Sequence, residues 1–109
     1  MTDQVIYYRA ETEDGRFVDN PSEDTIYMLL EELDLTGNTF VTIEPVEDDP
    51  AWYVSISLLA EGTYEVEYRD ALRHEHRLTT ETDRSDIARE ATIWMARPYR
   101  GQPRQRSTT

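Results

Sequence analysis

Residues 52–68 read WYVSISLLAEGTYEVEY, and this stretch decides the fold. Apolar and polar side chains alternate over 52–59 and again over 63–68, which is the period of a β-strand with one buried face. The segment between them contains Gly62 and has the length of a hairpin turn, so the two strands are predicted to pair antiparallel. The apolar face carries Trp52, Val54, Ile56, Leu58, Tyr64, Val66 and Tyr68.

Three other segments are predicted to be strands. Residues 4–9 are rich in β-branched and aromatic side chains, residues 39–44 run up to a proline, and residues 73–80 follow a turn. Between the first two lies an acidic loop, residues 10–19, in which Phe17 and Val18 could pair briefly with the first strand.

Two helices complete the pattern. The first is predicted to begin with Asn20 as its N-cap and Pro21 at its first position, and to present Ile26, Leu29, Leu30 and Leu33 on one face. The second begins at the cap Asp83, presents Ile87, Ala91, Trp94 and Met95, and ends at Pro98.

The predicted order is β-α-β-β-β-β-α, which defines an α+β domain over residues 1–97. We expect a mainly antiparallel sheet of four to five strands with both helices packed on one face. Residues 98–109 are arginine-rich, have little to bury and are predicted to be a disordered tail. The other face of the sheet is expected to carry Tyr53, Ser55, Ser57, Glu65, Glu67, Glu75 and Arg77.

Charge is distributed unevenly along the chain, whose net charge is −12. Residues 1–68 hold 17 acidic side chains and two arginines, whereas residues 69–109 hold six acidic side chains and nine arginines. The strongly acidic segment 1–68 is expected to repel the phosphate backbone of nucleic acids and to attract basic proteins. We therefore expect a basic protein partner and no direct nucleic-acid binding.

The sequence also allows a prediction of the cellular compartment. It has no cysteine, so disulfides and thiol chemistry are excluded. Its first twenty residues lack the basic start and apolar run of a signal peptide, and no apolar stretch is long enough to span a bilayer. A cytoplasmic protein without membrane association is expected.

No catalytic or cofactor motif is present. The four glycines form no phosphate-binding loop, and no serine lies near a histidine in a nucleophile motif. His74 and His76 are two apart and could share a metal, but two ligands do not make a site, and their face also carries Leu78. Partly buried core histidines are the favoured interpretation. We expect no metal, no cofactor and no enzymatic activity.

The candidate partner-binding residues fall in two groups. Glu47, Asp48 and Asp49 form an acidic loop that ends beside the aromatic residues Trp52 and Tyr53. Aromatic anchors within a charged rim are common at protein interfaces. The second group is Glu65 and Glu67, on the outward side of the hairpin.

The layout resembles the small immunity proteins of bacterial polymorphic toxin systems, in particular family one among them. The resemblance spans residues 4–97. It lies in a short first strand, the helix start Pro21-Ser22-Glu23-Asp24 leading to Leu29-Leu30, a meander with YEVEYRD at 64–70 and LTTE at 78–81, and a closing helix. Members of that family are non-enzymatic inhibitors encoded beside a toxin, often a nuclease or deaminase.

The resemblance implies that this chain binds and blocks a cognate basic toxin or enzyme. The alternative is a regulatory or accessory domain that forms homodimers and whose acidity serves solubility. The sequence leaves both a monomer and a homodimer open.

Overall fold

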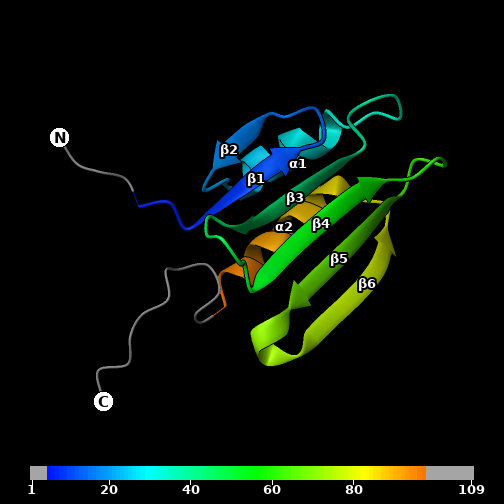
Figure 1. Cartoon of the computed structure of the whole chain (residues 1–109). Helices are drawn as coiled ribbons and strands as arrows, with labels where there is room; N and C mark the ends of the chain where they lie inside the picture. The colour runs from blue at the N-terminus through cyan, green and yellow to red at the C-terminus, as the bar shows by residue number, and fades with distance from the viewer. Residues whose placement is uncertain (1–4, 98–109) are drawn as a thin grey trace, which may run out of the picture.

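The computed structural model describes residues 5–97, which form six strands and two α-helices (Figure 1). In chain order the elements are β1 (Tyr8–Thr12), β2 (Phe17–Asp19), α1 (Glu23–Glu31), β3 (Phe40–Pro45), β4 (Trp52–Leu58), β5 (Tyr64–Asp70), the 3₁₀ turn η1 (Ala71–Arg73), β6 (Glu75–Glu81) and α2 (Arg84–Met95).

The strands form one antiparallel sheet in the order β2-β1-β3-β4-β5-β6. The α+β class and the β4–β5 hairpin are confirmed, but the sheet has six strands instead of four to five. The additional strand is β2, because Phe17 and its neighbours pair with β1 across a tight turn at Gly15. Gly15 has φ +94°, which only glycine adopts readily.

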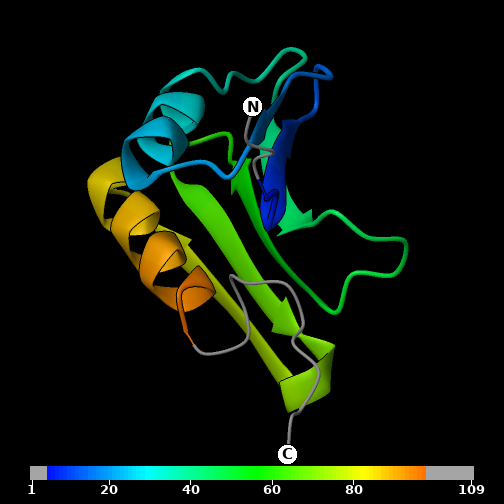
Figure 2. The ribbon, with the colours of Figure 1, turned by 90° about the vertical axis from the view of Figure 1, so that its left-hand side faces the viewer.

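Both helices pack on one face of the sheet (Figure 2). The core lies between the helices and the sheet. It contains the alternate apolar side chains of β3, β4 and β5, together with Ile26 and Leu30 of α1 and Ile87 of α2. Trp94 of α2 is buried in this core, with its ring centroid 5.7 Å from that of Trp52 and 5.1 Å from that of Tyr68. The strand periodicity therefore places the core where the sequence predicts it.

Helix α1 is capped two residues later than predicted. Ser22 is the N-cap, and its hydroxyl accepts a hydrogen bond from the Thr25 amide. Asn20 instead adopts a left-handed conformation, with φ +49°. Its side chain accepts a hydrogen bond from the Tyr7 amide at 2.8 Å and donates one to the Val5 carbonyl at 2.8 Å. Asn20 thus fastens the segment before β1 to the segment before α1.

The turn between β5 and β6 determines which way the β6 side chains point. Asp70 is fully buried and accepts hydrogen bonds from the amides of Leu72 and Arg73, and the Arg73 guanidinium lies 2.7 Å from its second oxygen. His74 follows in the left-handed region, with φ +55°. Strand β6 follows this turn and pairs with β5, so that Arg77 lies opposite Tyr68 and His76 lies opposite Arg69.

This register corrects the predicted faces of β6. Glu75 and Arg77 lie on the helix side, where the Glu75 carboxylate accepts a hydrogen bond from Trp94 Nε1 and Arg77 stacks over Tyr68. His76 and Leu78 lie on the opposite side and are exposed. His74 is exposed at the turn, so neither histidine belongs to the core.

The predicted tail, residues 98–109, lies outside the described residues. Within residues 5–97, neither helix is long and apolar enough to cross a membrane.

Candidate protein-binding face

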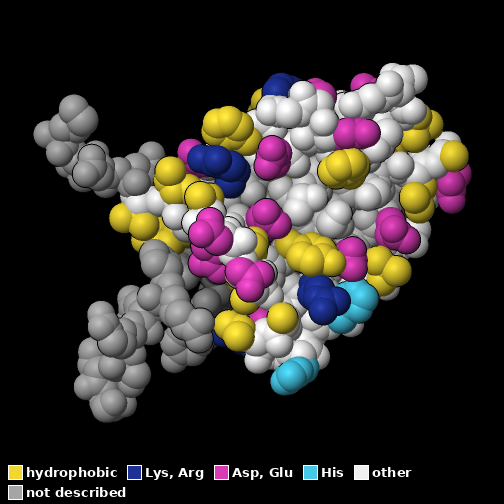
Figure 3. All heavy atoms as spheres, in the orientation of Figure 1, with side chains coloured by type: hydrophobic (Ala, Val, Ile, Leu, Met, Phe, Trp, Pro, Cys, Tyr) yellow, Lys and Arg dark blue, Asp and Glu magenta, His cyan; other side chains and the backbone are white. Residues whose placement is uncertain are grey.

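The side of the sheet that faces away from the helices is uncovered by either helix, and we call it the open face. Figure 3 views it in the orientation of Figure 1 and shows acidic and apolar side chains around a central band of other residues. The cross-strand pairings assign to it Arg9, Glu11, Phe17, Asp19, Phe40, Thr42, Glu44, Tyr53, Ser55, Ser57, Glu65, Glu67, Arg69, His76, Leu78 and Thr80.

A hollow of about 190 Å³ lies on the open face between β1 and β3 and is bordered by the start of the β3–β4 loop. Three carboxylates line it, from Glu11, Glu44 and Glu47, and we call it the acidic hollow. Among residues 5–97 the cation that lines it is Arg9, whose Nε lies 2.6 Å from Asp19, and this pairing raises the arginine pKa. The remaining lining residues are Thr42, Pro45 and Val46.

Glu44 is the half-buried carboxylate of this hollow. Its burial raises its pKa above the ordinary value, and the nearby negative charge of Glu11 raises it further. An ionised Glu44 is therefore held in a position that disfavours its charge. A cation placed in the acidic hollow would offset both effects, because it favours the ionised carboxylate.

A second polar cluster lies across β4, β5 and β6. One oxygen of the Glu67 carboxylate accepts a hydrogen bond from the Tyr53 hydroxyl at 3.1 Å and lies 2.8 Å from Nε2 of His76. Burial, followed by the neighbouring Glu67 carboxylate, raises the pKa of Tyr53. The His76 side chain is 53% exposed, so this cluster presents hydrogen-bonding groups at the surface.

The structure brings most of the predicted site residues onto or beside the open face. Glu47 lines the acidic hollow, whereas Asp48 and Asp49 are exposed in the adjoining loop. Tyr53 lies on the face itself. Glu65 and Glu67 lie there too, opposite Ser57 and Ser55 across the β4–β5 pairing.

Trp52 requires a correction. It is only 5% exposed and packs edge-to-face on Trp94, so it belongs to the core and is not available as a surface anchor. The reason is the strand period: Trp52 and Tyr53 point to opposite sides of the sheet, and only Tyr53 points outward.

The sequence prediction missed the contribution of β1 and β3. Glu11 lies between the buried Ala10 and Thr12, and Glu44 follows the buried Ile43, so the strand period predicts that both carboxylates point outward once residues 8–12 are assigned to a strand. Their proximity was not readable, because it depends on β1 pairing with β3 instead of with a neighbour in sequence. The exposed apolar residues of the open face, Phe17, Phe40 and Leu78, were also missed.

Within residues 5–97, no group of three or more His, Cys, Asp or Glu side chains is arranged so that it could hold a metal ion. Comparison with known protein families, curated proteins and solved structures gives no match. The function is therefore inferred from the geometry of this chain.

Proposed function

We propose that this chain is a non-catalytic protein-binding domain whose open face binds and neutralises a basic protein, as the immunity proteins that its sequence resembles do. The observation that carries the proposal is the acidic hollow. Glu44 is held there close to a second carboxylate, on the face of the sheet that neither helix covers.

The surroundings of the hollow support a protein ligand. Phe17 is 56% exposed and Leu78 is 57% exposed, which gives the polar face apolar contacts that a partner can bury. The net charge of −12 would accelerate the encounter with a basic partner, and the acidic hollow would orient it.

The proposal is tested by measuring binding to the product of the neighbouring gene, expressed as an inactive variant, by titration calorimetry over a range of salt concentrations. We expect affinity to fall as salt rises, because screening weakens long-range attraction. The double variant Glu44→Gln/Glu47→Gln should weaken binding by roughly tenfold or more, since a close interfacial charge pair is typically worth at least 1.5 kcal/mol.

The matched control is Glu23→Gln/Glu31→Gln, which removes the same charge from helix α1, on the other side of the sheet. If the control weakens binding as much as the hollow variant does, net charge alone acts and the open face is not the site. Light scattering on the free chain tests the alternative. A tight homodimer that buries the open face would favour the accessory-domain function.

A further inference from the structure

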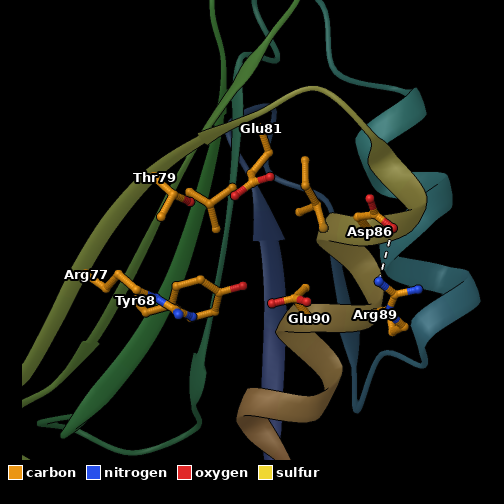
Figure 4. A pocket seen from close by; sticks show the side chains of 9 residues that line it. Tyr68, Arg77, Thr79, Glu81, Asp86, Arg89 and Glu90 are labelled. Atoms are coloured by element: carbon orange, nitrogen blue, oxygen red, sulfur yellow. Dashed lines mark hydrogen bonds and ion pairs between the residues drawn. The ribbon is translucent and has the colours of Figure 1, made fainter.

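A second hollow lies on the helix side of the sheet, between β6 and α2 (Figure 4). It also encloses about 190 Å³, and we call it the β6–α2 groove. It exists because the side chains of β6 on this side are polar and α2 does not cover them. Val66 and Ile87 form its apolar part, and its other lining residues are Tyr68, Arg77, Thr79, Glu81, Asp86, Arg89 and Glu90.

Tyr68 is 3% exposed, and its hydroxyl points across the groove in the direction of Glu90 (Figure 4). Burial raises the pKa of Tyr68 to about 12, with further contributions from Glu90 and Glu81. Arg77 stacks over the ring, with its guanidinium carbon 4.6 Å from the ring centroid. The positive charge of Arg77 and its hydrogen bond to the hydroxyl lower the Tyr68 pKa, but by less than burial raises it.

The charged side chains of the groove differ in their partners. Asp86 is paired with Arg89 at 3.1 Å, and Arg77 is engaged with Tyr68. Glu81 and Glu90 form no ion pair or hydrogen bond within residues 5–97. Two carboxylates, one from β6 and one from α2, therefore face the space beside the buried hydroxyl without a cation between them.

This arrangement defines the ligand chemically. The carboxylates of Glu81 and Glu90 can only accept hydrogen bonds and come from different walls of the groove, which favours a cation with several donors as the ligand. An arginine side chain has five N–H donors in one plane, and its methylene groups would lie along Val66 and Ile87. A lysine ammonium has only three donors at one point and fits such divergent acceptors less well.

The groove is open along β6, because β6 is an edge strand and no described strand lies beyond it. An extended segment that pairs with this edge would direct alternate side chains to the helix side of the sheet. A second copy of this chain is a poor candidate for that segment in the register centred on Leu78. Symmetric antiparallel pairing of two β6 strands about Leu78 would place Glu75 directly opposite Glu81 twice, and such like-charge pairs are destabilising.

We propose that an extended segment of a basic protein pairs with the edge of β6 and inserts an arginine side chain into the β6–α2 groove. The proposal goes beyond the proposed function, because the groove and the open face lie on opposite sides of the sheet and share no residue. Either site can therefore fail its test without affecting the other.

The test is an NMR titration of the full ¹⁵N-labelled chain with a blocked heptapeptide of alternating threonine and valine that carries one central arginine. We expect shifts concentrated at the amides of Thr79, Glu81 and Glu90. Replacing arginine by neutral, isosteric citrulline should weaken binding by roughly tenfold, the value of one charge-assisted hydrogen bond. The lysine peptide should bind with intermediate affinity.

The double variant Glu81→Gln/Glu90→Gln should lose the preference for arginine over citrulline. Both side chains are exposed, so the fold is expected to survive, and a thermal melt verifies this. The matched control Glu31→Gln/Glu61→Gln removes two exposed acids outside the groove and should retain the preference. Shifts centred on the open face, equal binding of the arginine and citrulline peptides, no binding, or a free chain already dimeric through β6 would each overturn the proposal.

Discussion

Glu44 carries a local stability cost that its proposed role in binding would explain. Its pKa is raised in the folded chain, chiefly by burial and then by Glu11. The folded state therefore holds its proton more tightly than the unfolded state does. The associated stability is fully present below the unfolded pKa and is lost as pH rises through the folded pKa. With no ion pair to it from residues 5–97, the ionised carboxylate destabilises the fold at neutral pH, and a cationic group of a bound partner would offset that cost.

We accordingly predict that Glu44→Gln raises the free energy of unfolding at pH 7, by up to about 0.5 kcal/mol, as expected for a partly exposed position. The gain should vanish below about pH 4, where the wild-type carboxyl is itself protonated. Urea titrations at several pH values measure it. Glu61→Gln, in the exposed β4–β5 turn, controls for the general benefit of removing one negative charge. An equal gain from both variants would show that the acidic hollow imposes no local cost.

At the scale of elements, the turn between β5 and β6 decides the face of an entire strand. His74 occupies the left-handed region there at φ +55°, which is unfavourable for a side chain with a Cβ atom. Asp70 fixes the preceding turn by accepting two backbone hydrogen bonds. Together they determine which β6 side chains face the helices. As a result, Glu81 lies in the β6–α2 groove and His76 lies on the open face.

We predict that His74→Gly raises the free energy of unfolding by about 0.5 kcal/mol, because glycine relieves the strain but gains freedom in the unfolded chain. The β-branched substitution His74→Val should lower it by about 1 kcal/mol. Thermal and urea unfolding measure both. Asn20→Gly is the contrasting case: Asn20 is also left-handed, but its side-chain hydrogen bonds to Tyr7 and Val5 would be lost, so it should destabilise. Stabilisation by Asn20→Gly, or none by His74→Gly, would contradict this account.

The same turn explains where prediction from the sequence succeeds and fails. Strands β4 and β5 alternate strongly between apolar and polar residues, so their faces and their pairing follow from the pattern. In β6 only Leu78 is apolar, and assigning it to the core reversed the strand. Which β6 side chains face the helices depends on the buried Asp70 and the left-handed His74, and neither feature appears as a periodic pattern in the sequence. The acidic hollow depends on the β1–β3 pairing, which is non-local and equally invisible to periodicity.

At the scale of the whole molecule, the net charge of −12 opposes folding and would favour binding to the proposed basic partner. Like charges repel within the compact chain, and dissolved salt screens this repulsion. The described ion pairs are mostly at the surface and contribute little each. Screening should therefore weaken repulsion within the folded chain more than attraction, and so stabilise it. In a complex with a basic partner, screening would weaken the attraction between the two proteins.

We predict that raising NaCl from about 20 mM to about 500 mM, which shortens the screening length from roughly 20 Å to roughly 4 Å, increases the melting temperature of the free chain by a few degrees. Over the same range the affinity for the basic partner should fall steadily. Scanning calorimetry of the free chain and titration of the complex measure the two trends in one buffer series. Sodium sulfate is unsuitable here, because it also strengthens apolar burial. A melting temperature that falls with NaCl would mean that the ion pairs outweigh the net repulsion, and an affinity insensitive to salt would mean that the acidic faces do not contact a basic surface.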